Sequence, residues 1–213
     1  MLTASVILLQ PRLQMATAGW PQALARLTDL VVLSIPLLVA VFVAARVSGD
    51  RFATATGLRG FSWVDAAAGV GIGLIARALV ELVAPTVGGI GGGLEVESAG
   101  VAGGIVVALA GAVLVTPLIE ELFFRGLLQR ALGDALAGAG RTVAGVVAVL
   151  VSTLAFVALH VVAAGAQVPV GVIVGPLAVG LGCGILTLLT GRLAGAIVAH
   201  VVSNAIGVAL LIW

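Results

Sequence analysis

The stretch 143–159, VAGVVAVLVSTLAFVAL, decides the class of this fold. It contains no charged residue and is apolar on nearly every face. A membrane β-strand would alternate apolar and polar residues, and this stretch does not. The stretch 170–189 has the same character. Both stretches therefore predict helices that cross the hydrocarbon core of a membrane, which takes about 20 mostly apolar residues.

The whole chain has the composition of a membrane protein. Of its 213 residues, 62% are apolar and 9% are charged, whereas a soluble domain carries about 25% charged residues. Apolar stretches that could cross a membrane lie at 28–46, 64–85, 101–118, 142–162, 168–190 and 193–213. We therefore predict an all-α fold, a polytopic transmembrane helix bundle of about six to eight membrane helices.

The region 101–136 is too long for one crossing, because a continuous helix would span about 54 Å at 1.5 Å per residue. Pro117 is the one possible break in this region. A proline removes a helix hydrogen bond, so we predict that one span ends near Pro117 and that a second helix begins near Leu118. We divide the chain into N-terminal membrane helices, 1–99, and a second helix bundle, 100–213.

The charges of the chain limit its partners and its location. The net charge is +1, and the ten basic residues are all arginine and form no cluster, so nucleic acid is not an expected partner. The expected partners are membrane lipid and a membrane-associated protein or peptide. The absence of lysine and the abundance of alanine, glycine, valine and arginine indicate GC-rich coding. We therefore expect an integral protein of a bacterial cytoplasmic membrane.

The sequence Glu120-Glu121 with Arg125 is the densest polar patch in the second half of the chain. An ionisable residue within a membrane span is costly and by default indicates function. Glu121 and Arg125 are four residues apart, so they share a helix face and can neutralise each other. Glu120 points about 100° away and is free to face something else. The alternative interpretation is a charge cluster at the membrane interface.

The two histidines of the chain, His160 and His200, both lie in apolar stretches. Each on its own is typical of a hydrogen-bonded packing residue. A helical hairpin that turns near 138–140 would place Glu120 and His160 at similar depth, because they lie about 19 and 21 residues from the turn. His200 follows Arg192 by eight residues, so an ideal helix places it about 15 Å from the depth of the other two. A tilted helix, a re-entrant helix or a deeper Arg192 would close this gap, and we expect Glu120, His160, His200 and Asn204 to line one cavity.

Arg77 and Glu81 form the other charged pair inside an apolar stretch. Their spacing of four residues places them on one helix face, where they can neutralise each other. Such a pair costs less to insert than either charge alone, so we favour a structural role for it.

Three motifs occur in a fixed order along the second half of the chain. They are EExxxR at 120–125, FxxxH at 156–160 and HxxxN at 200–204. Together they resemble the signature of the CPBP family, which includes the type II CAAX prenyl endopeptidases and the bacterial ABI proteins. The resemblance covers about residues 100–210 and implies an intramembrane endopeptidase that acts on a membrane-associated or lipid-anchored protein or peptide.

The resemblance also implies a role for each motif residue. The catalytic residues would be Glu120, His160, His200 and Asn204, and the supporting residues would be Glu121, Arg125 and Phe156. Glu120 would activate water with His160 beside it. His200 and Asn204 would polarise the scissile carbonyl and stabilise the oxyanion. A base, a proton shuttle and neutral donors are what peptide hydrolysis needs.

Cofactor use and two other functions stay open at this point. We favour a site without a cofactor; the alternative is zinc held by Glu120, His160 and His200, because the family has also been described as metalloproteases. A transporter or ion pathway would also use buried Glu, His and Arg, but would need further polar residues across both leaflets. A haem protein would use the two histidines as axial ligands and leave the acidic motif without a role.

Overall fold

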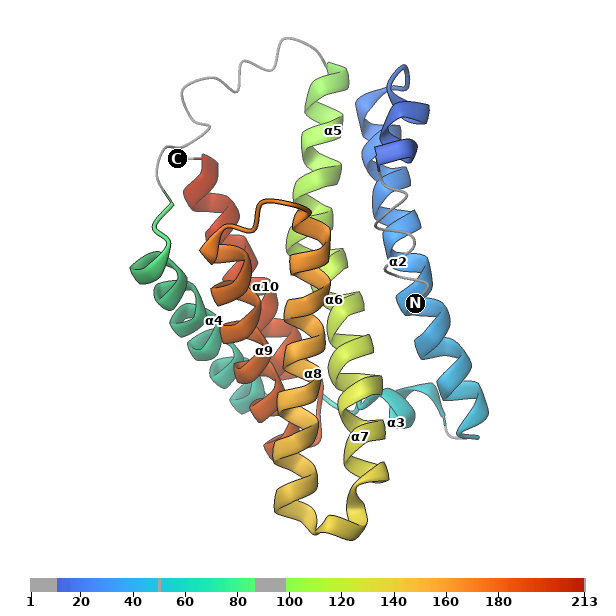
Figure 1. Cartoon of the computed structure of the whole chain (residues 1–213), viewed down its shortest axis with the longest axis vertical. Helices are drawn as coiled ribbons and strands as arrows, with labels where there is room; N and C mark the ends of the chain where they lie inside the picture. Colours follow the sequence, from blue (N-terminus) through green and yellow to red (C-terminus); the bar gives the residue numbers. More distant parts are fainter. Residues whose placement is uncertain (1–10, 50, 87–98, 213) are drawn as a thin grey trace.

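In the computed structural model, residues 11–49, 51–86 and 99–212 are described, and all regular structure in these ranges is helical. Six of the described helices are long and apolar enough to cross a membrane (Figure 1), which confirms the predicted polytopic helix bundle. The main elements are α2 (Gln22–Val47), α3 (Phe52–Thr56), α4 (Trp63–Val83), α5 (Ala99–Ala110), α6 (Thr116–Glu121), α7 (Arg130–Ala135), α8 (Arg141–Ala164), α9 (Val170–Thr190) and α10 (Ala194–Ile212).

The third membrane span is one continuous helix, so the predicted break at Pro117 is wrong. It runs over Ala102–Ala135, 34 residues, through α5, α6 and α7. Two π-helical segments, Gly111–Val115 and Leu122–Gln129, join these three parts. Figure 1 shows the result as a single long helix beside α2 and α8.

The π-helical segment before Pro117 explains why the helix continues. The N–H of Thr116 bonds the carbonyl oxygen of Gly111, five residues back, instead of that of Ala112. The next N–H that could reach Ala112 O belongs to residue 117, and proline has none. Ala112 O therefore lacks both helical partners, and Asn204 Nδ2 from α10 donates to it at 2.9 Å. A side chain from a distant helix thus replaces the bond that the proline removes.

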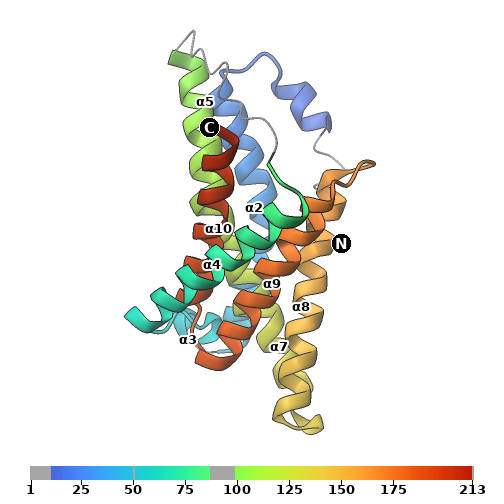
Figure 2. The same ribbon diagram turned by 90° about the vertical axis from the view of Figure 1, so that its left-hand side faces the viewer.

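The helices α7 and α8 form the predicted antiparallel hairpin, which turns at Ala137–Ala139. This hairpin extends further than the neighbouring turn between α9 and α10, as both views show (Figures 1 and 2). Arg130 Nη2, inside the hairpin, donates to the carbonyl oxygen of Gly191 in the α9–α10 turn at 2.7 Å. The two turns therefore lie at different depths.

The core gathers side chains from four of the spans around the polar motifs. Phe124, Phe156, Cys183 and Ala199 are all at most 2% exposed and pack together. On one side α4 crosses α9 and α10 obliquely (Figure 2). The motif residues thus lie in the middle of the bundle, between α6, α8 and α10.

Candidate active site

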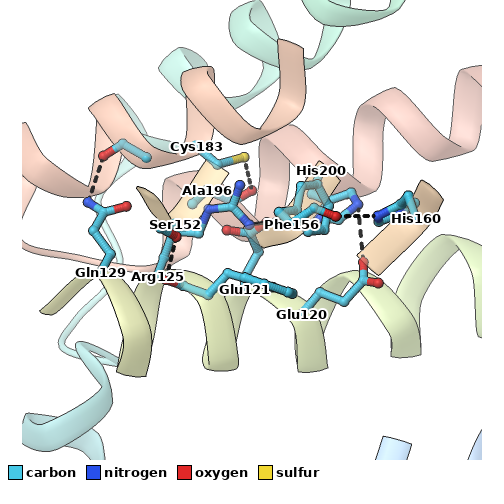
Figure 3. A network of polar contacts seen from close by, with 12 residues as sticks. Glu120, Glu121, Arg125, Gln129, Ser152, Phe156, His160, Cys183, Ala196 and His200 are labelled. Carbon is cyan, nitrogen blue, oxygen red and sulfur yellow. Dashed lines mark hydrogen bonds and ion pairs between the residues drawn. The ribbon is translucent and has the colours of Figure 1, made fainter. Parts of the chain in front are cut away.

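Glu120 and Glu121 are the last two residues of α6, and both are buried. Because they are neighbours on a helix, their side chains leave it in different directions. Figure 3 shows the side chain of Glu121 among Arg125, Phe156 and His200, while that of Glu120 points toward His160 and His200. The two carboxylates therefore have different surroundings, as the sequence predicts.

Glu121 Oε1 is the acceptor of two charge-assisted contacts. Arg125 Nη1 donates to it at 3.0 Å, which confirms the predicted pair, and neither side chain is exposed. His200 Nδ1 lies 2.9 Å from the same oxygen. The second contact was missed at the sequence level, where Glu121 was paired with Arg125 alone. Glu121 thus connects the first motif to the third.

This contact fixes the orientation of the His200 ring. A carboxylate that is paired with arginine only accepts hydrogen bonds, so Nδ1 of His200 carries the hydrogen. The other ring nitrogen, Nε2, faces Glu120 and lies 3.7 Å from its Oε2. A carboxylate that holds one nitrogen of a catalytic histidine sets the tautomer and stabilises the imidazolium. Glu121 holds His200 in this manner.

Phe156 packs against three charged or ionisable groups of the site. Its ring lies edge-to-face with His160 and His200, at centroid distances of 4.5 and 5.5 Å. The guanidinium carbon of Arg125 lies 4.7 Å from its centroid. The backbone carbonyl of Phe156 accepts from His160 Nδ1 at 2.9 Å, so Nδ1 of His160 carries a hydrogen. Phe156 therefore positions both histidines and the arginine.

The gap of about 15 Å that ideal helices predict between the depths of His200 and Glu120 is closed by a deeper position of Arg192, one of the three ways that we expected. The ideal placement assumes that both helical turns lie at one depth. The contact between Arg130 and Gly191 shows the real register. Glu120 lies ten residues before Arg130, and His200 lies nine residues after Gly191. These nearly equal lengths of chain bring the two residues to a similar depth.

Two cavities meet at His160. The smaller one, about 260 Å³, lies between α2 and the bundle, and Glu120 and His160 line it among mostly aliphatic side chains. The larger one, about 560 Å³, is lined by His160, His200 and Asn204. We expected one cavity for all four residues. The structure instead distributes them over two cavities, because Glu120 lines only the smaller one. Glu120 nevertheless faces His200, with Oε2 3.7 Å from Nε2.

Arg77 and Glu81 form the predicted ion pair on α4. Thr86 completes it, because its backbone N–H and its hydroxyl both donate to the carboxylate of Glu81, each at 2.8 Å. Arg77 and Thr86 also line the larger cavity. Arg77 lies next to Gly207, which is two turns of α10 beyond His200. The charges of Arg77 and Glu81 therefore neutralise each other.

Two polar contacts around the motif helix were also missed at the sequence level. Ser152 Oγ of α8 donates to the carbonyl oxygen of Phe124 at 2.8 Å. Gln129 Nε2 donates to the carbonyl oxygen of Gly184 in α9 at 2.9 Å. Both contacts attach the π-helical segment Leu122–Gln129 to its neighbours (Figure 3). Their signal in the sequence is weak, because serine and glutamine inside apolar stretches also occur without such roles.

The zinc alternative requires Glu120, His160 and His200 to converge on one point. Within the part of the chain that the structure describes, no three His, Cys, Asp or Glu side chains are arranged to hold a metal ion together. Glu121 Oε1 and His200 Nδ1 bind each other, and His160 Nδ1 is engaged with its own helix. Both histidines would therefore have to bind zinc through Nε2.

The arrangement has the parts that hydrolysis of a carbonyl compound requires. Glu120 is a buried carboxylate with no arginine partner among the described residues, so it can accept a proton from water. His200 can stabilise an oxyanion through Nε2 when it is protonated, because Glu121 supports its charge. Asn204 keeps one amide N–H besides the one that binds Ala112. These groups define a candidate site for acid–base chemistry inside a helical membrane bundle.

The comparison with protein families agrees with this class of site. Residues 102–206 match the model of the Rce1-like type II CAAX prenyl endopeptidase family. This match supports the assignment of residues 102–206 to the CPBP family of CAAX proteases, and it includes all three motifs. No curated protein and no solved structure matches the chain.

Proposed function

We propose that this chain hydrolyses a peptide bond of a membrane-associated or lipid-anchored protein or peptide, with Glu120 as the base that activates water. The observation that carries the proposal is the position of Glu120 Oε2, 3.7 Å from His200 Nε2, while Glu121 holds the other side of the His200 ring. One carboxylate is thus free to accept a proton, and the neighbouring one orients the histidine.

The proposed reaction uses only groups of this chain and one water molecule. Glu120 takes a proton from the water while the water oxygen attacks the scissile carbonyl carbon. His200 and the remaining amide N–H of Asn204 stabilise the oxyanion. When the C–N bond breaks, Glu120 returns its proton to the leaving nitrogen. His160 supports the transfer, because it lines both cavities beside Glu120 and His200.

Two features of the chain support a substrate that comes from the membrane. The smaller cavity opens between α2 and the bundle and is lined mainly by leucine, isoleucine and alanine, so an apolar segment fits there. All of the motif residues lie in candidate membrane spans. We also propose the bacterial cytoplasmic membrane as the location, from the coding bias that the composition indicates.

The experiment that tests this function compares cells that produce the native protein with cells that produce Glu120→Gln. Proteome-wide labelling of new protein termini in the membrane fraction identifies cleaved substrates. The proposal predicts new termini that appear with the native protein, disappear with Glu120→Gln and reappear on complementation. A control variant, Arg141→Gln, changes an exposed residue at the α7–α8 turn and should behave as the native protein does. The same termini in all strains would contradict the proposal.

A further inference from the structure

The depth of His200 depends on where the α9–α10 turn is held. His200 follows Gly191 by nine residues and lies in α10, which begins at Ala194, directly after the turn. A shift of the turn along the bundle axis would therefore move His200 by the same distance. The contacts to Glu121 at 2.9 Å and to Glu120 at 3.7 Å leave little tolerance for such a shift.

Three contacts from three different segments hold this turn. Arg192 donates to Asp65 on α4 through two nitrogens, Nε at 2.6 Å and Nη2 at 2.8 Å. The backbone N–H of Leu193 donates to the carbonyl oxygen of Gly57 at 3.0 Å. Arg130 donates to Gly191, as described above. The turn itself needs Gly191, whose φ of 66° is left-handed.

The pair of Arg192 and Asp65 is the strongest of these contacts by its chemistry. A two-pronged contact between arginine and a carboxylate fixes direction as well as distance. Hydrogen bonding to Asp65 also raises the pKa of Arg192 above its ordinary value. Asp65 is almost fully buried, and Arg192 lies between two membrane spans.

The face of α4 that carries Asp65 also contacts α10 further along, next to His200. A Cβ at Gly69 would lie 2.4 Å from the carbonyl oxygen of Gly195, and a Cβ at Gly73 would lie 2.5 Å from that of Ala199. Ala199 directly precedes His200. A Cβ at Gly71, on another face of α4, would meet nothing within 4 Å. The helix α4 thus packs against α10 from the α9–α10 turn to the active site.

We propose that Asp65 and Arg192 are positioning residues that set the depth of α10, and thereby hold His200 against Glu121 and Glu120. This inference rests on the proposed function for its catalytic consequence. It extends the active site to α4, which lies outside the region 102–206 that matches the family. Neither residue touches the reacting groups, so both act through α10.

The test uses the fact that the chain has two histidines. Protein labelled with ¹⁵N-histidine and reconstituted in lipid nanodiscs gives nitrogen signals for His160 and His200 only, and a His160→Gln sample assigns them. Arg192→Gln and Asp65→Asn should shift the His200 signals and leave those of His160 in place. Arg192→Lys, which keeps the charge but loses the two-pronged contact, should restore the His200 signals in part. Arg141→Gln serves as the matched control.

Activity provides the second measurement, on a substrate identified as described above. A misplacement of about 1 Å can cost up to 100-fold in rate, so kcat of Arg192→Gln should fall by about 10- to 100-fold while KM changes little. The NMR result does not require activity, so a failure of the proposed function and a failure of this inference are distinguishable. Native His200 signals and a native kcat in folded Arg192→Gln would overturn the inference.

If Arg192→Gln does not fold, a second pair of variants tests the inference. Gly73→Ala places a methyl group against the carbonyl oxygen of Ala199, whereas Gly71→Ala points into open space on the same helix. The inference predicts a shift of the His200 signals in Gly73→Ala and native signals in Gly71→Ala. Equal, native signals in both variants would contradict it.

Discussion

Glu121 Oε1 lies 2.9 Å from His200 Nδ1, although the two residues are separated by 79 positions in the sequence. The same oxygen accepts from Arg125 at 3.0 Å. One oxygen atom of a fully buried carboxylate therefore holds a structural cation on one side and the candidate catalytic histidine on the other. The two neighbouring glutamates thus have separate surroundings: Glu121 belongs to the framework, and Glu120 faces the site at which we propose that the reaction occurs.

The first prediction concerns this framework. Arg125→Ala should reduce the free energy of unfolding by about 3–5 kcal/mol, because it leaves Glu121 buried with His200 as its one remaining partner. Thermal unfolding in mild detergent and the yield of monodisperse protein measure the effect. The double variant Glu121→Gln with Arg125→Met removes both charges and should be more stable than Arg125→Ala. If Arg125→Ala unfolded as the native protein does, the structural role of this pair would be wrong.

The second prediction separates the two uses of Asn204. Asn204→Leu should lower stability by about 0.5–1.5 kcal/mol, because Ala112 O loses its hydrogen bond. Adding Pro117→Ala supplies a backbone N–H within reach of Ala112 O, so the double variant should regain stability. Proteolysis should stay low in both variants, because the oxyanion loses its amide donor. Recovery of activity together with stability would instead show that Asn204 acts only through the helix.

The third prediction concerns metal. Three protein ligands at about 2.0–2.2 Å are needed for a catalytic zinc. If Glu120 is the base and Glu121 is held by Arg125 and His200, the chain lacks a third ligand at the site. Activity should therefore survive extensive chelation, and purified protein should carry far less than one zinc per chain by elemental analysis. Stoichiometric zinc whose removal and return switch activity off and on would make the enzyme a metalloprotease.

The helices could be predicted from the sequence because their signal is local. The stretch 143–159 is apolar on nearly every face, and the observed helix α8 covers it entirely. The pairs Glu121 with Arg125 and Arg77 with Glu81 were predictable for the same reason, since four residues make about one helical turn. In these cases the deciding interaction lies within one helix.

The features that the sequence did not predict depend on distant residues. Pro117 does not end its helix, because Asn204, on another helix, binds the carbonyl oxygen that the proline leaves free. The depth of His200 could not be derived from its distance to Arg192 alone, because it follows from the contact between Arg130 and Gly191. The division of the site into two cavities is likewise a result of tertiary packing.

The most direct test of the account is the rate at which purified Glu120→Gln, reconstituted in lipid, cleaves a substrate of the native protein. Removal of a general base should lower kcat by about 10²- to 10⁴-fold. The fold should persist, because glutamine keeps the shape of the side chain and Glu120 has no arginine partner among the described residues. The account therefore predicts a native unfolding temperature with cleavage reduced at least a hundredfold. Cleavage at the native rate by folded Glu120→Gln would contradict it.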